Sequence, residues 1–219
     1  MTERIDHILE EPPISKRERQ KEAKNQALID AALTVFSRVG FAAAKMDDVA
    51  REAGVSKGTV YLYFESKEQL FEEMVKANMA PLMNEIAENL QRPGMTAADR
   101  LKTHMKFFYT KILNTNRRQI MRLIMAEGPN FPHLAEFYHA NVLSRGQAVL
   151  NAIIQEGVDS GEFRHMQGHG LAQNIAAGAL IAGIWKLVFE PFQPLDLDAY
   201  FDTHVDLILN GLRVPERPN

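Results

Sequence analysis

The chain has 219 residues, 46% of them hydrophobic, so it can bury a sizeable core and is not disordered as a whole. The absence of cysteine excludes disulfide frameworks, thiol nucleophiles, thiolate zinc sites and iron–sulfur clusters. The net charge is −3, but residues 16–67 carry +3 and the remainder −6. A basic segment joined to an acidic body is typical of a phosphate-facing module with a separate partner function.

The N-terminal segment, residues 1–15, is polar and contains Pro12 and Pro13. It lacks the apolar centre of a signal peptide, and no uninterrupted apolar run of about 18 residues follows it. We therefore expect a cytoplasmic protein without a membrane span. Residues 1–15 and 213–219 are expected to be flexible tails.

Helical periodicity dominates and strand alternation is absent, which predicts an all-α protein. The first helix is expected over residues 16–39, with Gly40 at its C-terminal cap. Its basic start, residues 16–24, is either a solvated helix end or an arm that reaches DNA. Two short helices follow over residues 46–53 and 57–64, which is the spacing of a helix-turn-helix that reads the major groove.

The remaining elements are also expected to be helical. Ser66 and Gln69 form a capping box for a fourth helix, which Pro81 either kinks or divides. Glycine and proline clusters separate the later helices, which are expected over residues 96–113, 117–127, 132–160, 170–189 and 197–212.

The outward face of the second short helix follows from the rotation of 100° per residue. Val60 and Phe64 mark its buried side, so Gly58 and Leu62 point away from the protein. An outward leucine suits a thymine methyl, and the amine of Lys57 suits a guanine edge. The free N–H groups of residues 56–59 suit a phosphate. We also expect backbone contacts from Lys45, Tyr63 and Lys67.

The residues around this motif form an ordered pattern of about fifty positions, which includes Gly40-Phe41, Met46-Asp47-Asp48-Val49-Ala50, Ala53-Gly54-Val55-Ser56-Lys57-Gly58-Thr59-Val60-Tyr61, Tyr63-Phe64 and Ser66-Lys67-Glu68. The pattern resembles the DNA-binding domain of the TetR family of repressors. Lys45 departs from it, because the family usually has Thr or Ser as the cap at this position. Residues 125–138 and 161–164 are similar to one common version of the family's regulatory domain.

The resemblance implies a helix-turn-helix domain of residues 16–66 and a ligand-binding and dimerisation domain of residues 67–212. It places base contacts on Lys57, Gly58 and Tyr61, with Leu62 beside them, and phosphate contacts on Ser56, Thr59, Tyr63 and Lys67. We expect a homodimeric transcriptional regulator, most simply a repressor, that binds a palindromic operator in double-stranded DNA and is released by a small apolar effector.

Two other classes of protein fit the sequence less well. An enzyme is not expected, because the sequence has no Gly-rich phosphate loop, zinc-protease helix, nucleophile elbow or cofactor fingerprint. An architectural DNA-binding protein without a ligand would not need the long acidic body. His165 and His169 have the i, i+4 spacing of metal ligands, but the glycines around them disfavour a helix and no further ligand is near, so no metal is predicted.

The body is rich in methionine and aromatic residues, which by default form core. Flexible, polarizable side chains also suit a pocket that accepts apolar ligands. We predict a pocket among the middle helices, lined by Met79, Met83, His104, Phe108, Met121, Met125, Phe137 and Trp185.

The last two helices carry small and apolar residues that either belong to the core or meet a second subunit. The resemblance implies that these helices pair with their two-fold mates in a four-helix bundle. We therefore predict a dimer interface formed by Ala172, Ala176, Ala179, Leu180, Gly183, Val205, Ile208 and Leu212.

Overall fold

The computed structural model describes residues 15–166 and 170–214, and most of the two predicted tails lies outside these ranges. Within them the protein is helical and has no strand, apart from an isolated bridge between Phe163 and Arg213. The predicted all-α fold is therefore confirmed. The helices are α1 (Lys16–Ala43), α2 (Met46–Glu52), α3 (Lys57–Tyr63), α4 (Lys67–Leu90), α5 (Ala97–Phe108), α6 (Arg118–Glu127), α7 (Pro132–Tyr138), α8 (Ser144–Asp159), α9 (Leu171–Ile184) and α10 (Leu197–Leu212).

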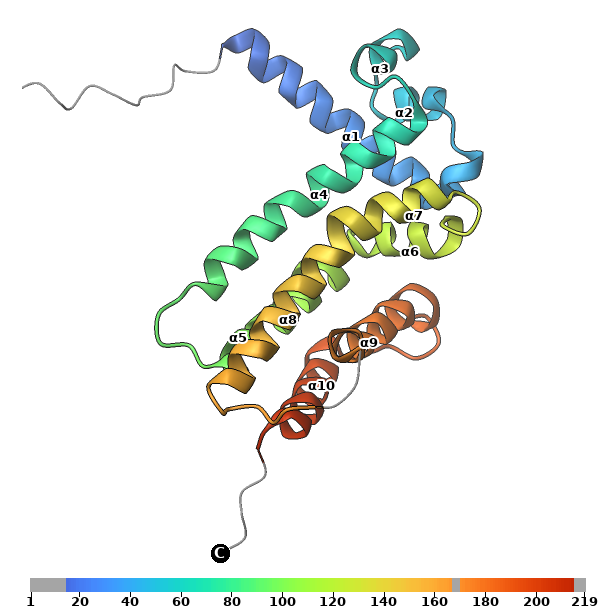
Figure 1. Ribbon diagram of the computed structural model, residues 1–219. Coiled ribbons are helices and arrows are strands. Elements are labelled where there is room, and N and C mark those ends of the chain that lie inside the picture. Colours follow the sequence, from blue (N-terminus) through green and yellow to red (C-terminus); the bar gives the residue numbers. More distant parts are fainter. Residues whose placement is uncertain (1–14, 167–169, 215–219) are drawn as a thin grey trace, which may run out of the picture.

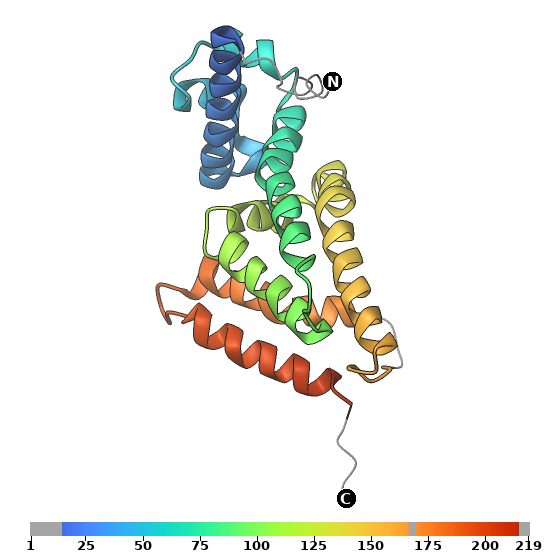
Figure 2. The same cartoon turned by 90° about the vertical axis from the view of Figure 1, so that its left-hand side faces the viewer.

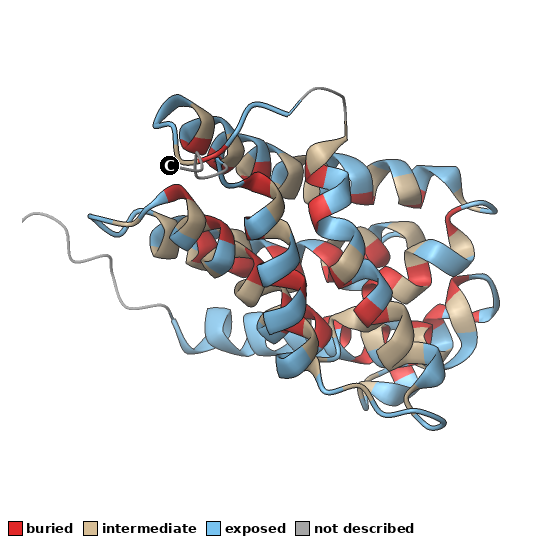
Figure 3. Ribbon diagram, turned by 90° about the horizontal axis from the view of Figure 1, so that it is seen from below, coloured by how far each residue is buried: buried red, intermediate tan, exposed pale blue. Residues whose placement is uncertain are grey.

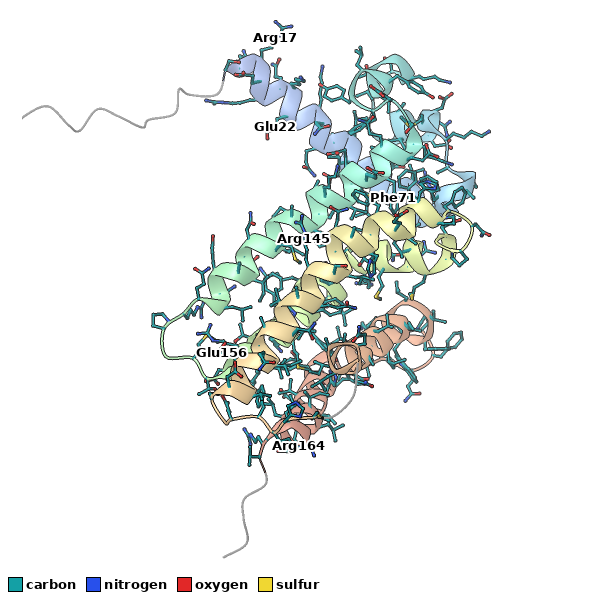
Figure 4. All side chains as sticks on the ribbon, in the orientation of Figure 1. Arg17, Glu22, Phe71, Arg145, Glu156 and Arg164 are labelled. Carbon is teal, nitrogen blue, oxygen red and sulfur yellow. The ribbon has the colours of Figure 1, made fainter. Side chains whose placement is uncertain are left out.

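Helices α1 to α3 form a small head, from which α4 descends along the larger body (Figure 1). Exposed residues 16–24 form the first turns of α1, which project beyond the rest of the head. Arg17 and Glu22 are labelled on this projecting part in Figure 4.

Local capping chemistry sets the boundaries of the head helices. The Ser56 hydroxyl accepts the Thr59 N–H at 3.1 Å, and the Ser66 hydroxyl accepts the Gln69 N–H at the same distance. Gly40 has a φ of +80°, so regular helix ends there and residues 41–43 add only a last turn. At the start of α2 the Asp48 carboxylate accepts the N–H of Lys45 at 3.2 Å, whereas Lys45 has no side-chain oxygen to accept a helix N–H as Ser or Thr would.

One core joins the head to the upper body. Phe36 and Phe41 of α1 pack with Phe71 of α4, and the Phe131 ring lies 5.0 Å from that of Phe41. Figure 4 shows Phe71 where α4 passes beside α7. The end of α1 therefore packs on residues of both the head and the body.

Helix α4 is continuous through Pro81, so the proline does not divide it. Pro81 is exposed and removes one backbone donor from the helix. Nearby, the Arg117 guanidinium donates to the Asn78 carbonyl at 3.1 Å. This bond ties the middle of α4 to the segment that precedes α6.

The lower body is built from α5, α8, α9 and α10, which enclose a second core that includes Leu101, Leu113, Ile175 and Phe201. Figure 2 shows α9 and α10 crossing beneath the other helices of the body. Buried and exposed segments alternate along these helices when the molecule is seen from below (Figure 3). Three π-helical turns, η1 (Tyr109–Leu113), η2 (His139–Leu143) and η3 (Trp185–Phe189), respectively extend α5, lead into α8 and extend α9.

Two segments, residues 16–43 and 171–189, are long and apolar enough to cross a bilayer by length and composition alone. The apolar side of the first contributes to the core of the head. The second is not an uninterrupted apolar run, because it contains Gln173, Asn174 and Lys186. Most of the second segment is not buried within the protomer.

Candidate functional site

The outward face of α3 is open. Val60 and Phe64 are buried in the core that includes the head, whereas Leu62 is 84% exposed and Tyr61 is 47% exposed. The structure therefore has the orientation that the helical rotation predicts. Leu62 and Tyr61 thus leave the outward side of this seven-residue helix accessible to a partner.

Lys57 begins α3 and lies beside α2. Its Nζ is 2.8 Å from an Asp47 carboxylate oxygen, and this hydrogen-bonded pair raises the pKa of Lys57 above its ordinary value. Both side chains are exposed, so the pair holds Lys57 only weakly. The amine is therefore free to leave Asp47 for a base edge.

The start of α3 presents small polar groups. The Ser56 and Thr59 hydroxyls lie 2.8 Å apart. Gly58 is exposed, and a Cβ at this glycine would lie 3.9 Å from the Ser56 hydroxyl oxygen. Tyr63 is half-buried beside the Phe64 ring, while Lys45 is exposed at the start of α2. These positions border the outward face of α3 on both sides.

Lys67 has a role that differs from the predicted phosphate contact. Its Nζ donates to the carbonyls of Phe41 at 2.7 Å, Ala42 at 3.2 Å and Ala44 at 3.2 Å, and lies 4.4 Å from the centre of the Phe41 ring. The last turn of α1 leaves carbonyls without helical N–H partners, and the ammonium group satisfies them. Lys67 therefore bonds within the protein in this structure, and its phosphate contact stays a prediction.

A small cavity of about 70 Å³ lies in the lower body. Helices α5, α8, α9 and α10 and the η1 turn line it with His104, Met105, Phe108, Tyr109, Leu150, Ile175, Ala176, Ala179 and His204. Of the predicted pocket residues, only His104 and Phe108 belong to this lining.

The other predicted pocket residues lie elsewhere. Met79 is buried in the core shared with the head, and Met83 packs against that core. Met121 packs against Gly183, and a Cβ at this glycine would come within 2.4 Å of the Met121 methyl group. The remaining three lie apart from the cavity. Met125 is exposed, Phe137 packs against the core shared with the head and lies beneath Lys76, and the half-buried Trp185 donates its indole N–H to the Gln193 carbonyl.

Two polar residues of the cavity are absent from the pocket that the sequence predicts. The Tyr109 hydroxyl and the Nδ1 of His204 are 3.0 Å apart. Burial raises the pKa of Tyr109 and lowers that of His204, although a hydrogen bond with the Ile175 backbone opposes the second shift. Gly178 gives His204 its space, because a Cβ there would lie 2.5 Å from the imidazole Nε2. A polar residue within an otherwise apolar helical stripe is the signal that could have found His204.

His104 differs from this pair because its Nδ1 is buried and has no hydrogen-bond partner among the described residues. Burial lowers the pKa of His104 to about 4. The imidazole is therefore neutral near neutral pH, with one ring nitrogen available for a hydrogen bond.

The predicted dimer residues divide between the interior and the surface. Five are buried within the protomer, which corrects their assignment to an interface: Ala172, Ala179, Gly183, Val205 and Leu212. The glycines of α9 let it approach α10, α6 and the η1 turn closely. Ala176 and Leu180 are exposed, and Ile208 borders an open groove between α9 and α10.

Helix α9, the η3 turn that extends it and α10 carry exposed apolar side chains, here called the α9–α10 face: Leu180, which belongs to the predicted set, and Ile181, Val188 and Leu207, which do not. Beside it, the groove between the two helices has a volume of about 580 Å³. Ile181 falls between the stripe positions Leu180 and Gly183, so the sequence could have indicated this part of the face.

No cluster of three or more potential metal ligands occurs in the part of the chain that the structure describes. His165 is exposed, and His169 lies outside the described residues.

The family model for bacterial regulatory proteins of the tetR family matches residues 28–74, and that for the C-terminal domain of AefR-like transcriptional repressors matches residues 99–209. The fatty acid metabolism regulator protein of Bacillus subtilis is 25% identical over 195 residues, which cover 89% of this chain and 98% of the relative. The repressor KstR2 of Rhodococcus jostii is 23% identical over 211 residues, which cover 93% of this chain and 98% of the relative.

Solved structures share the fold. The regulator FadR of Bacillus subtilis in complex with stearoyl-CoA has a TM-score of 0.71 and 23% identity, with 85% of this chain and 98% of FadR covered. A transcriptional regulator of Saccharomonospora viridis in complex with choline has a TM-score of 0.74 and 20% identity. The match covers 90% of this chain and 100% of that regulator.

A helical body carrying a helix-turn-helix head with an open reading helix defines a DNA-binding transcriptional regulator rather than an enzyme. The chain belongs to the TetR family.

Proposed function

We propose that this regulator is a homodimeric repressor that holds a palindromic operator with both heads and releases it when an apolar effector enters the body. The observation that carries the proposal is the open face of α3, with Leu62 almost fully exposed and Lys57 beside it. The division into a DNA-binding domain of residues 16–66 and a ligand-binding and dimerisation domain of residues 67–212 is part of the proposal. Its place of action is the cytoplasm, where bacterial DNA lies.

The proposed DNA contacts follow from the exposure of the side chains. Base contacts come from Lys57, Gly58, Tyr61 and Leu62, with Leu62 against a thymine methyl and Lys57 on a guanine edge. Contacts to the phosphate backbone come from exposed or half-exposed groups around α3, namely Lys45, Ser56, Thr59 and Tyr63.

The proposed dimer uses the α9–α10 face. Its apolar side chains are exposed in the protomer and lie on two adjacent helices, which suits a four-helix bundle about a two-fold axis. Two heads related by such an axis read half-sites about 34 Å apart, which corresponds to one turn of DNA.

The proposed effector is apolar and occupies the cavity between α5, α8, α9 and α10. Apolar side chains form most of its walls. The complex of FadR with stearoyl-CoA, a relative that shares the fold, makes a ligand with an acyl chain the first candidate.

Helix α6 supplies the proposed coupling between the cavity and the head. On its cavity side, Met121 packs against Gly183 of α9. On its head side, the Glu127 carboxylate accepts the Phe41 N–H at 2.9 Å, and the Arg122 guanidinium donates to the Ser37 carbonyl. A ligand that displaces α9 thus shifts the end of α1 and, with it, the head. Weakening DNA binding 100-fold requires a coupling free energy of about 2.7 kcal/mol.

The test is selection of bound DNA from a random pool with the full chain, followed by affinity measurements on the selected site. Lys57→Ala and Leu62→Ala are each expected to reduce the preference for the selected site about tenfold or more, while the protein remains dimeric. Lys102→Ala removes an exposed lysine of α5 and serves as the charge-matched control. Selection of no defined sequence, or unchanged preference in both α3 variants, contradicts the assignment.

A further inference from the structure

One residue of the cavity lining carries a buried hydrogen-bonding atom that has no partner among the described residues. His104 lines the cavity, and its Nδ1 is buried without a partner among the described residues. Buried polar atoms of folded proteins nearly always have a partner, so an exception indicates a missing ligand or a bound water. The other polar groups of the lining, Tyr109 and His204, already bond to each other.

The charge of the cavity restricts what that partner is. None of the residues that line it carries a carboxylate, an ammonium or a guanidinium group. The low pKa of His104 keeps its imidazole neutral as well. An ionised carboxylate or phosphate buried here would lose its hydration without meeting a cation, which is strongly unfavourable.

We infer that His104 is the specificity residue of the cavity and that it binds an uncharged hydrogen-bonding group of an apolar ligand, such as a hydroxyl, an ester or a thioester. The ionised form of the corresponding carboxylic acid is rejected. This inference rests on the proposed function, because it takes the cavity to be the effector site.

The cavity is large enough for the polar group of a ligand but too small for its apolar chain. Ligand pockets usually measure about 300–1,000 Å³, whereas this cavity measures about 70 Å³. It accommodates the polar group beside His104 and only a few further atoms. The apolar chain must separate the walls, where the flexible Met105 side chain and the π-helical turn that begins at Tyr109 offer the least resistance.

Binding of a matched set of probes to the full chain tests the inference by calorimetry. The set is decanol, methyl decanoate, decanoate and the hydrocarbon undecane. Decanol is expected to bind about tenfold or more tightly than decanoate and undecane, because of these three ligands only decanol offers His104 a neutral polar group. If methyl decanoate matches decanol, the imidazole donates to the ligand from Nδ1. If it binds as weakly as undecane, the nitrogen accepts from the hydroxyl instead, and esters and thioesters are then excluded as ligands.

Three variants test whether His104 causes the preference for decanol over undecane. His104→Leu should remove the advantage of decanol over undecane, and His104→Gln should retain most of it, because the amide still forms a hydrogen bond. His139→Leu changes an exposed histidine outside the cavity and should leave the preference unchanged. Thermal melts show whether each variant remains folded.

Tight binding of decanoate, an undiminished preference in His104→Leu, or binding of none of the probes would overturn the inference. Because the assay contains no DNA, its outcome is separate from that of the proposed function. If the neutral probes bind through His104 but leave the operator complex intact, effector control fails while the inference stands. If the operator is bound but no probe is, the inference fails while DNA recognition stands.

Discussion

Lys67 stabilises the head rather than reaching outward, because the end of α1 leaves backbone carbonyls without partners. Its ammonium group donates to three of them and lies over the Phe41 ring. A buried carbonyl that loses its donor is unfavourable whatever replaces the lysine. A single side chain thus closes the junction between α1 and α4.

Lys67→Met is therefore expected to lower the free energy of unfolding by about 1–3 kcal/mol, since the methionine keeps the apolar stem but loses the donors. Urea denaturation measures this change. Lys102→Met, at an exposed position of α5, should stay within about 0.5 kcal/mol of the wild type. Unchanged stability, together with a shallower salt dependence of DNA binding, would return Lys67 to the phosphate-contacting residues.

His104 makes stability depend on pH. Burial lowers its pKa to about 4, whereas the unfolded chain has a value of about 6.5, so the unfolded state binds more protons between these values. Stability is complete above about pH 6.5 and decreases as the pH falls toward about 4. By about pH 5 the loss from this one group is about 2 kcal/mol.

His104→Gln removes this contribution and leaves the other histidines in place. The difference in unfolding free energy between wild type and variant should thus shift by about 2 kcal/mol in favour of the variant between about pH 7.5 and pH 5. Denaturation curves at both pH values measure the shift. Parallel pH dependences of the two proteins would contradict the burial of a neutral imidazole.

At the scale of the helix, α8 shows why the surroundings of a glycine matter more than its place in a helix. Gly146 has open space where a Cβ would project. At Gly157, in the same helix, a Cβ would lie 2.1 Å from the Phe163 ring, whose position is held by the turn after α8. The same substitution therefore has opposite consequences at the two positions.

Gly146→Ala is expected to raise the free energy of unfolding by about 0.5–1 kcal/mol, because alanine reduces the entropy lost when the helix forms. Gly157→Ala is expected to lower it by about 1–3 kcal/mol, because the methyl group overpacks the core. Each variant is the control for the other in one series of urea denaturation curves. Equal signs for the two changes would show that helix propensity alone governs α8.

At the scale of the whole molecule, the distribution of apolar surface indicates how protomers associate. The small residues of α9 are used within the protomer, while Ile181, Leu207 and their neighbours on the α9–α10 face remain exposed. An isolated protomer presents this face to water, which supports the proposed burial of the face against a second copy.

Ile181→Glu and Leu207→Glu should each convert the proposed dimer to a monomer, because a dimer would bury the new carboxylate without a cation. Sedimentation velocity measures the mass, and circular dichroism shows whether the helices persist. Leu143→Glu places the same charge on an exposed leucine of η2 and should leave the mass unchanged. Dissociation by Leu143→Glu, with both other variants dimeric, would move the interface away from α9 and α10.

The boundaries of the helices and the open side of α3 could be predicted from the sequence because they depend on neighbours along the chain. Ser56, Ser66 and Gly40 act on backbone groups a few residues away, and the rotation of the helix separates Val60 from Leu62. These local rules were enough to indicate the two short helices and the outward side of α3, whereas the family was indicated by the resemblance of the residue pattern.

The cavity, the position of Lys67 and the division of α9 into inner and outer sides depend on residues far apart in sequence. Tyr109 meets His204, Met121 meets Gly183, and Lys67 meets the end of α1 only after the helices have packed. Methionines and small residues have the same helical period whether they line a cavity, fill a core or face a second subunit. Which of these roles each one takes is decided by the packing partner that the fold brings to it.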